Sequence, residues 1–395
     1  MRLSSISRIA IVTICAVGVL SVVKSNTLLA NQQIAKLNLS PLPKQKPGVP
    51  FPTEKWQTEA LKPTDKAKLD TAINKAFDNS SPELGETRAI IVVKGGKIIA
   101  EKYGQGFNED SKLNSWSMAK SITASLFAIT MKDNKISLDA AIEDPHWRKD
   151  DKRNLIKYRE ALQMSDGINW RENDYSDPIH NDAAIMLFGK GREDIVKYTA
   201  NRPLKHKSGE VWNYSSGTTN LISAGISRAL GPRTIDDPTG KERYRNFIFD
   251  RLFHEIGMND SAPEFDAAGN FYASSLVQAT AQDYARFGLL HLRDGIWENK
   301  RILPEGWVDF VRTPAVTKGA EAYGAHWWLS LENKKGLLKN GPYDSFEAQG
   351  HEGQVIMIVP SKDLVIVRLG LSTHENAWDA IGEYLSAIVE SVPIN

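Results

Sequence analysis

The sequence predicts an α+β fold in which an antiparallel sheet is flanked by helices and interrupted by an inserted, all-helical domain. Runs typical of β-strands occur over residues 89–101 and return only after position 325, whereas residues 140–312 are mostly helical in pattern. Since strands from both ends of the chain can complete one sheet, the middle segment is expected to leave the sheet and return. We therefore assign residues 63–116 and 313–395 to the sheet domain and residues 117–312 to the helical insert.

The composition is that of an ordinary globular protein, and it argues against several kinds of partner. Of the 395 residues, 41% are hydrophobic, and 49 Lys and Arg residues are balanced by 48 Asp and Glu residues. This balance leaves no basic surface of the kind that binds nucleic acid or an anionic membrane. We expect a small-molecule substrate, no nucleic acid and no stable membrane partner, and the oligomeric state stays open.

Residues 1–30 have the pattern of a secretory signal peptide. Arg2 and Arg8 precede an apolar run over residues 9–23, which is shorter than the roughly 20 residues needed to span a bilayer. An uncleaved membrane anchor is thus the weaker alternative. Cleavage at the end of the signal would also remove Cys15, the only cysteine, so the mature chain could form no disulfide and no thiol metal site. We expect a periplasmic or secreted bacterial protein.

Residues 31–62 contain a cluster of prolines and are expected to form an extended linker between the signal and the folded body. The body begins near Thr64 with an amphipathic helix, in which apolar residues recur every four positions over residues 69–77. Residues 89–93 and 98–101 follow as two strands joined by a tight Lys-Gly-Gly-Lys turn.

Glycine and proline mark the ends of the helices in the middle segment. A buried helix is opened by Ser117, and two more are expected over residues 218–230 and 280–293. The side chain of Thr280 can cap the last of these, with Asp283 three residues on.

Strands return in the last quarter of the chain. Residues 325–331, 354–359 and 364–371 carry β-type runs, and a Pro-Ser-Lys-Asp turn separates the last two. A closing amphipathic helix over residues 376–392 completes the predicted sheet domain.

Ser117 and Lys120 form a Ser-x-x-Lys motif at the start of an apolar helix. This spacing places the lysine amine one turn along the same face, where it can take the hydroxyl proton and make the serine a nucleophile. The motif is short enough to arise by chance, and Ser21 and Lys24 repeat it inside the apolar N-terminal stretch. The alternative is a helix-capping serine followed by a solvated lysine.

Tyr214 and Ser216 follow a glycine turn and stand in front of a predicted helix. A tyrosine hydroxyl near Lys120 could relay a proton to a leaving group, and Ser216 could bind substrate. The alternative is a half-buried aromatic residue next to a helix cap, since similar triplets begin at Tyr244 and Tyr272.

The segment from Gly350 to Gln354 leads into the next predicted strand and contains His351. A glycine such as Gly353 lets a substrate approach the strand edge, and the backbone amides of Gln354 and Ser117 could form an oxyanion hole. The alternative is that the glycines only bend the strand.

The three motifs, Ser-Met-Ala-Lys, Tyr-Ser-Ser and His-Glu-Gly, in this order resemble those of the serine β-lactamase-like hydrolases. This family includes class C β-lactamases, penicillin-binding carboxypeptidases, carboxylesterases and nylon-oligomer amide hydrolases. The likeness extends over roughly residues 65–390. It implies a β-lactamase or DD-peptidase-like fold, catalytic roles for Ser117, Lys120 and Tyr214, and no metal or cofactor. Further matching positions are Gly209, residues 279–288 and residues 301–304.

Departures from the family pattern narrow the expected activity. His351 and Glu352 stand where β-lactamases carry a lysine and a threonine that help to hold the carboxylate of the antibiotic, and Ser216 stands where they usually carry asparagine. A histidine is only partly charged near neutral pH, and Glu352 would add negative charge to the cleft. We therefore expect poor turnover of β-lactams.

One loop resembles narrower relatives. Residues 174–178 are similar to the Asp-Tyr-x-Asp-Pro segment of 6-aminohexanoate-dimer hydrolases, in which the tyrosine contacts the amide nitrogen of the substrate. By this resemblance Tyr175 is a substrate-binding candidate, with a plain loop aromatic as the alternative. Trp170 could wall an acyl pocket or simply pack in the core.

Together these features predict an exported serine hydrolase that cleaves ester or linear amide bonds through an acyl-enzyme on Ser117. That role requires burial and cationic neighbours to keep Lys120 neutral. The alternatives are a D-alanyl peptide carboxypeptidase, a weak β-lactamase, and a non-catalytic protein of the same fold that binds an acyl compound or a peptide. The sequence does not rank ester, linear amide and D-amino-acid peptide as substrates.

Overall fold

The computed structural model describes residues 39–78, 81–172, 176–320, 322–332 and 335–393. From Ser40 onward the chain forms one compact unit. The predicted signal peptide lies outside the described residues, so export and signal cleavage stay predictions. Among the described ranges, no helix combines the length and the apolar character that crossing a membrane requires.

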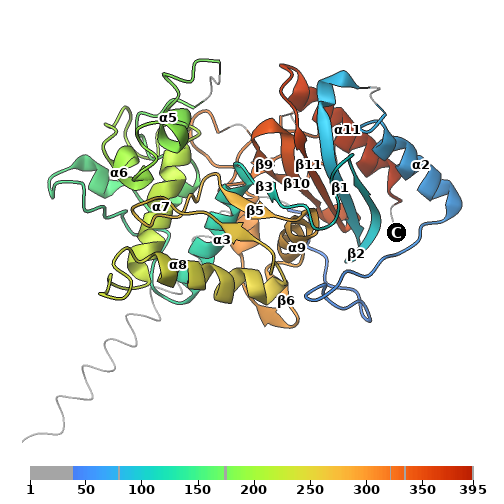
Figure 1. Ribbon diagram of the computed structural model, residues 1–395, viewed down its shortest axis with the longest axis horizontal. Helices are drawn as coiled ribbons and strands as arrows, with labels where there is room; N and C mark the ends of the chain where they lie inside the picture. Colours follow the sequence, from blue (N-terminus) through green and yellow to red (C-terminus); the bar gives the residue numbers. More distant parts are fainter. Residues whose placement is uncertain (1–38, 79–80, 173–175, 321, 333–334, 394–395) are drawn as a thin grey trace, which may run out of the picture. The chain divides into compact units, whose positions relative to one another are not determined.

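In the described part of the chain, the central element is an antiparallel sheet of six strands in the order β2-β1-β11-β10-β9-β8 (Figure 1). β1 pairs with β11, with Ile90 opposite Arg368. Strands from the two ends of the chain therefore complete one sheet, which confirms the predicted α+β class. The strands are β1 (Glu86–Lys94), β2 (Lys97–Tyr103), β8 (Trp328–Leu329), β9 (Phe346–Gly350), β10 (Gln354–Val359) and β11 (Leu364–Leu371).

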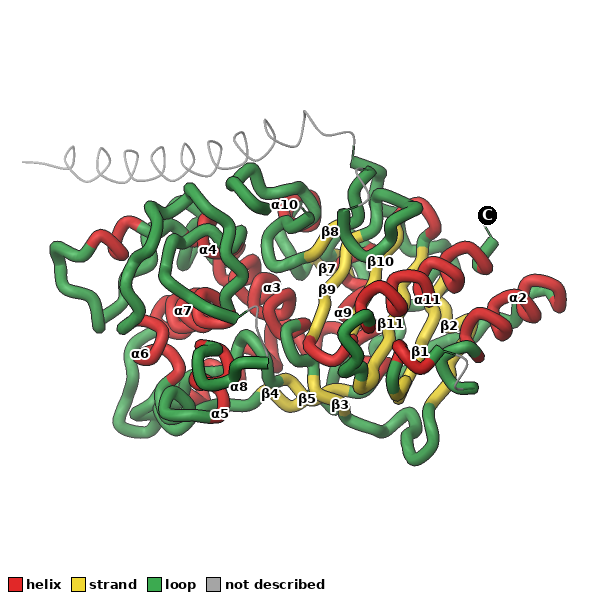
Figure 2. Tube along the Cα trace, turned by 90° about the horizontal axis from the view of Figure 1, so that it is seen from above, coloured by secondary structure: helices red, strands yellow, loops and turns green. Residues whose placement is uncertain are grey.

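Helices cover both faces of this sheet (Figure 2). Ile90 and Val92 belong to one buried cluster, and Ile91 and Val93 belong to the other. Successive side chains of a strand point to opposite faces, so a strand covered on both sides reads as a continuous apolar run. The helices on one face are α2 (Pro63–Asn74) and α11 (Ala377–Ser391), and those on the other are α3 (Met118–Lys132) and α9 (Ala281–Leu292).

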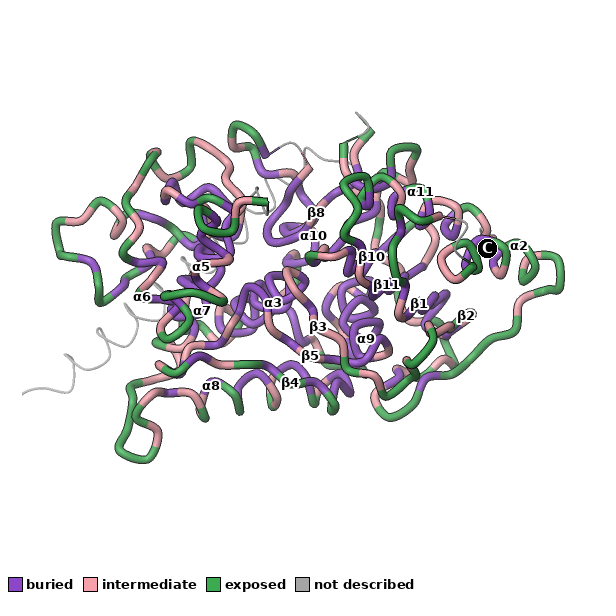
Figure 3. Tube along the Cα trace, turned by 45° about the horizontal axis from the view of Figure 1, so that its top comes forward, coloured by how far each residue is buried: buried purple, intermediate pink, exposed green. Residues whose placement is uncertain are grey.

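Beyond the sheet, the remaining helices gather around α3 and α7. Figure 3 shows that α3 and α9 are largely buried, which places them at the centre of the molecule. The predicted cap of α9 is present, because Thr280 Oγ1 accepts a hydrogen bond from the Asp283 amide at 3.1 Å. The other helices are α4 (Tyr158–Leu162), α5 (Asp182–Phe188), α6 (Ile195–Ala200), α7 (Ser216–Ala229), α8 (Lys241–Ile248) and α10 (Trp307–Val311), and the short turns are η1 (Pro82–Leu84), η2 (Lys152–Leu155), η3 (Phe249–Phe253), η4 (His254–Ile256), η5 (His351–Gly353) and η6 (Pro360–Lys362).

The segment that we predicted to be helical also contains short strands, and one of its helices belongs with the sheet. α9 packs against β10 and β11 so closely that a Cβ atom on Gly288 would lie 2.6 Å from Val365 Cγ1. The predicted boundary at residue 312 places this helix in the insert, since helical periodicity reveals a buried face but not its partner. The domain division stays a prediction. The short strands of this segment are β4 (Ala262–Pro263), β5 (Val277–Ala279), β6 (Ile296–Trp297) and β7 (Lys300–Arg301), and β3 (Leu113–Asn114) lies just before it.

Two strands differ from the prediction near the edge of the main sheet. The run over residues 325–331 forms only the two-residue β8, because His326 adopts a φ of 60°, which breaks the extended backbone. β9 was not predicted, since Glu, Ala, Gln and Gly are poor strand formers. Its pairing with β10 nevertheless holds it in the sheet.

The described part of the proline-rich segment packs on the folded body, whereas residues 31–38 of the predicted linker over residues 31–62 lie outside the described residues. In its described part Trp56 is buried, and the Pro52 carbonyl accepts a hydrogen bond from Arg286 Nε at 2.8 Å. Thr58 pairs with Ile98 as a parallel bridge beside β2. An extended proline-rich backbone has no internal hydrogen bonds, so its carbonyls are free to bond the body while its apolar side chains are buried.

Candidate active site

Ser117 stands at the start of a buried helix. It is the residue before α3, whose side chains from Met118 to Thr130 are all buried, while Ser117 itself remains partly exposed. The turn before it is fixed to β5: the Ser115 amide donates to the Val277 carbonyl at 2.8 Å, and the Val277 amide donates to Ser115 Oγ at 3.1 Å. The serine hydroxyl is therefore accessible but rigidly supported.

The structure brings Lys120 to the Ser117 hydroxyl. Lys120 Nζ lies 2.8 Å from Ser117 Oγ and 2.8 Å from Ser216 Oγ, and it donates to the Ser274 carbonyl at 3.2 Å. Only 1% of Lys120 is exposed. Burial lowers the pKa of Lys120 to about 8, although the nearby Glu172 carboxylate acts in the opposite direction. The amine thus has a substantial neutral population near neutral pH, as a base requires.

Glu172 is a site residue that the sequence did not reveal. It is buried, its Oε1 lies 3.9 Å from Lys120 Nζ, and its Oε2 accepts hydrogen bonds from the Ser216 amide at 2.6 Å and Trp170 Nε1 at 2.7 Å. A glutamate in a polar stretch reads as a solvated loop residue, so no sequence signal pointed to it. Trp170 is buried and orients this carboxylate, which favours the packing alternative over an acyl-pocket wall.

Ser216 lies between Lys120 and Glu172. It is 1% exposed, and its hydroxyl donates to Glu172 Oε1 at 2.6 Å while lying 2.8 Å from Lys120 Nζ. In this geometry Ser216 links the lysine to the buried carboxylate, and its predicted contact with substrate stays a prediction. Tyr175, the other substrate-binding candidate of the helical region, lies outside the described residues.

Tyr214 lies beside the lysine. Lys120 Nζ is 4.7 Å from the centroid of the Tyr214 ring, within the range of a cation–π contact. The ring packs against Trp212, Tyr323 and Trp328 with centroid distances of 6.3, 6.1 and 5.5 Å. We call these four residues the aromatic wall. The Tyr214 ring covers one side of the lysine amine, and the other three rings of the wall support it.

The predicted third segment adjoins the nucleophile through the end of β9. A Cβ atom on Gly350 would lie 2.4 Å from the Ser115 carbonyl oxygen, so only glycine allows the strand to approach this closely. The ring of His351 lies 5.3 Å from that of Trp116, and Trp116 Nε1 donates to Glu352 Oε2 at 3.0 Å. The end of β9 and the η5 turn therefore lie against the two residues before Ser117.

Gln354 and Gly353 have structural positions in the β9–β10 hairpin. Gln354 pairs with Gly350, and its side chain donates to the Gly370 carbonyl at 2.7 Å and accepts from the Gly370 amide at 3.0 Å. Gly353 has a φ of 83°, and a Cβ atom there would lie 2.3 Å from Arg368 Nη1. Gly350, the residue opposite Gln354 in the hairpin, lies against Ser115, and the predicted oxyanion role of the Gln354 amide stays a prediction.

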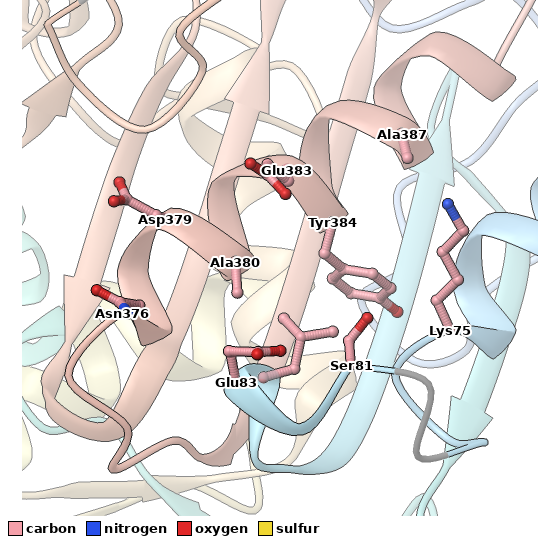
Figure 4. A pocket seen from close by; sticks show the side chains of 10 residues that line it. Lys75, Ser81, Glu83, Asn376, Asp379, Ala380, Glu383, Tyr384 and Ala387 are labelled. Carbon is pink, nitrogen blue, oxygen red and sulfur yellow. The ribbon is translucent and has the colours of Figure 1, made fainter.

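Two described hollows lie away from these residues. One, of about 520 Å³, is formed by α11 and the η1 region on the opposite face of the sheet from α3, and includes Tyr384 and Glu383 (Figure 4). The other, of about 400 Å³, includes Arg228 and Arg243. Neither contains a residue of the Ser117 constellation. Among the residues that the structure describes, no group of three or more His, Cys, Asp and Glu side chains is arranged to hold a metal ion.

Known proteins resemble this chain in sequence and in fold. The chain is 24% identical over 305 residues to the 6-aminohexanoate-dimer hydrolase of Paenarthrobacter ureafaciens, with 72% of each chain covered. A solved structure from Bacillus anthracis, assigned as a candidate 6-aminohexanoate-dimer hydrolase, has a TM-score of 0.67 at 21% identity and covers 90% of this chain and 92% of its own.

A class C β-lactamase structure superimposes with a TM-score of 0.62 at 15% identity, covering 85% of this chain and all of its own length. At these identities the solved structures establish the fold and no more. The model of the Beta-lactamase family matches residues 86–389, which include all three predicted motifs. With its serine and buried lysine in contact and more than half of its length matched, the chain belongs to the Beta-lactamase family of serine hydrolases.

Proposed function

We propose that this protein is a serine hydrolase that cleaves ester or linear amide bonds through an acyl-enzyme on Ser117. The observation that carries the proposal is the 2.8 Å contact between Ser117 Oγ and the buried amine of Lys120. A buried lysine with a lowered pKa is suited to remove a hydroxyl proton, whereas a solvated lysine is not.

Acylation follows from these positions. Lys120 takes the proton of Ser117 as Oγ forms a bond to the substrate carbonyl carbon, and the carbonyl electron pair moves onto its oxygen. The amide of Ser117, at the N-terminus of α3, is placed to stabilise this oxyanion. As the carbonyl re-forms, the bond to the leaving alcohol or amine breaks, and the leaving group receives the proton of Lys120 by way of the Tyr214 hydroxyl.

Deacylation reverses these proton movements. A water molecule attacks the acyl carbon and gives one proton to the Lys120 and Tyr214 pair, and that proton returns to Ser117 Oγ as the ester bond breaks. The products are a carboxylic acid and the regenerated serine. Glu172 and Ser216 act as positioning residues, because they hold the Lys120 amine toward Ser117 without reaching the reacting atoms.

Several observations favour esters and linear amides as substrates. The segment beside the nucleophile carries His351 and Glu352, with no permanent cation among its described residues to hold a β-lactam carboxylate. The curated relative is a hydrolase of 6-aminohexanoate dimers, and that name supports a linear amide.

We further propose export to the periplasm or the medium, which rests on the signal-like pattern of residues 1–30.

A panel of substrates tests this proposal. We expect wild-type protein to release p-nitrophenol from p-nitrophenyl esters with an initial burst that matches the enzyme concentration, and Ser117→Ala to abolish the burst. The 6-aminohexanoate dimer, a D-alanyl peptide and a chromogenic cephalosporin complete the panel. Cephalosporin turnover comparable with that of a simple ester would contradict the proposed substrate class, and D-alanine release at the highest rate would favour the carboxypeptidase alternative.

A further inference from the structure

Three aromatic side chains from three different elements meet beside Ser117. The centroid of the Trp116 ring lies 5.3 Å from that of His351 and 6.4 Å from that of Phe188, and both pairs are edge-to-face, at 86° and 74°. Such geometry is favourable for aromatic rings. Trp116 precedes the nucleophile, Phe188 ends α5, and His351 follows β9. We call these three residues the Trp116 platform.

Trp116 is held in one orientation. Its φ of 43° is in the left-handed region, which is unfavourable for a bulky side chain and persists only where the surroundings impose it. Trp116 Nε1 donates to Glu352 Oε2 at 3.0 Å, and Glu352 itself has a φ of 61°. Two unfavourable backbone conformations thus fix an indole ring next to the proposed nucleophile.

Phe188 remains 64% exposed although it contacts this ring. Single exposed apolar residues are common and carry no function in themselves: Leu155 and Ile235 are more exposed and lie elsewhere. The location of Phe188 is what distinguishes it. A large apolar side chain beside a proposed catalytic serine gains burial when a substrate group covers it.

We propose that the Trp116 platform binds an uncharged, apolar acyl group of the substrate, either an alkyl chain or an aryl ring. This inference rests on the proposed function, since it takes Ser117 as the atom that attacks the carbonyl. We assign the acyl group, and not the leaving group, to the platform. The reason is that Tyr214, which passes a proton to the leaving group, belongs to the aromatic wall. The Glu352 carboxylate beside the platform disfavours an anionic acyl chain.

The first test compares p-nitrophenyl octanoate with p-nitrophenyl acetate, which share a leaving group. We expect Phe188→Ala to lower the ratio of kcat/KM for octanoate to that for acetate about tenfold, in the range that one lost apolar contact gives. Phe188→Leu should retain most of the preference. Leu155→Ala, which removes a similarly exposed apolar side chain elsewhere, should leave the ratio unchanged. A ratio that is the same in Phe188→Ala and wild type overturns the platform.

A binding measurement separates this inference from the proposed function. Ser117→Ala is titrated with N-methyloctanamide by isothermal calorimetry, and the measurement is repeated with Phe188→Ala added. We expect about tenfold weaker binding in the double variant, whether or not the wild type turns over esters. Equal affinities of Ser117→Ala and the double variant for N-methyloctanamide, or no binding by Ser117→Ala, would overturn the proposed role of the platform. If the wild type does not turn over esters but binding of N-methyloctanamide still depends on Phe188, the proposed function is rejected and the apolar binding site is retained.

Discussion

Residues three apart on a helix are neighbours by geometry, but the chemistry of Ser117 and Lys120 depends on burial that no motif encodes. The lysine is 1% exposed and contacts Ser216 as well as Ser117. Sequence reasoning identified the pair, and it could not identify Glu172, since the approach of that carboxylate depends on the packing of a loop far along the chain. The contacts of Ser216 with Lys120 and Glu172 were not predictable for the same reason.

The pKa of Lys120 predicts the pH dependence of the reaction. Burial lowers this pKa to about 8, and only the neutral amine can accept the Ser117 proton. The active form therefore accumulates as pH rises, and about a tenth of the amine is neutral at pH 7. We expect kcat/KM for an activated ester to rise with pH and to level off above about pH 8. A profile that is flat from pH 6 to 9 would contradict the role of Lys120 as base.

Glu172→Gln tests the positioning of the lysine. The carboxylate raises the pKa of Lys120 against the larger effect of burial, so removing its charge lowers that pKa further. We expect the rising limb of the pH profile to move to lower pH. The free energy of unfolding should fall by about 2 kcal/mol, because buried hydrogen bonds to a charged acceptor are lost.

The matched control for this variant is Asp182→Asn. Asp182 is equally buried and accepts hydrogen bonds from the Arg171 amide and Tyr198, in the helical region. Asp182→Asn should lose a similar free energy of unfolding, and the rising limb of its pH profile of kcat/KM should stay at the wild-type pH. If the rising limb of Glu172→Gln also stays at the wild-type pH, the proposed coupling between the carboxylate and the lysine is excluded.

At the scale of elements, the site depends on how closely β9 approaches the turn before α3. Strong apolar patterns predicted β10 and β11 with the bounds that the structure has, whereas β9 carries weak strand formers and was missed. Because β9 was missed, the sequence did not predict that the end of this strand lies beside the turn before α3. The sequence predicts an oxyanion site with the Gln354 amide, and in the structure the residue against the Ser115 carbonyl is Gly350, which Gln354 faces.

Gly350→Ala tests this approach. The added Cβ would lie 2.4 Å from the Ser115 carbonyl oxygen, so the turn that carries Ser117 must move. We expect kcat/KM to fall at least about a hundredfold, since small displacements of reacting groups are costly. The loss of stability should be about 1–3 kcal/mol, as for other overpacked sites.

Gly382→Ala provides the comparison. Its Cβ would lie 2.6 Å from the Leu337 carbonyl oxygen, an equally severe clash, but on α11 at the opposite face of the sheet. This variant should lose similar stability, measured by urea denaturation, and retain its kcat/KM. Equal losses of activity in both variants would show that the effect of Gly350→Ala is general destabilisation.

At the scale of the whole molecule, the α+β class and the return of the chain to one sheet were predictable because strand patterns occur at both ends. Which helix covers which face was not predictable, as α9 illustrates, since its partner strands are distant in sequence. The contacts of the proline-rich segment with the folded body were likewise not predictable. Its composition describes an extended backbone but not the surface on which that backbone lies.

Trp56→Ala measures how firmly this segment is attached. Trp56 is 6% exposed and belongs to the main core cluster, so its removal should lower the free energy of unfolding by about 3 kcal/mol. Trp378→Ala on α11 is the control, because that side chain is 39% exposed and its loss should cost less than about 1 kcal/mol. Equal, small effects would restore the interpretation of this segment as a linker.

The most direct test of the account is covalent labelling of the proposed nucleophile. Wild-type protein is incubated with a fluorophosphonate at pH 8, and its intact mass and labelled peptide are determined by mass spectrometry. We predict a single adduct on Ser117, slower labelling in Lys120→Ala and no adduct in Ser117→Ala. Labelling that persists in Ser117→Ala, or that maps to another residue, would contradict the assignment of Ser117 and Lys120 as nucleophile and base.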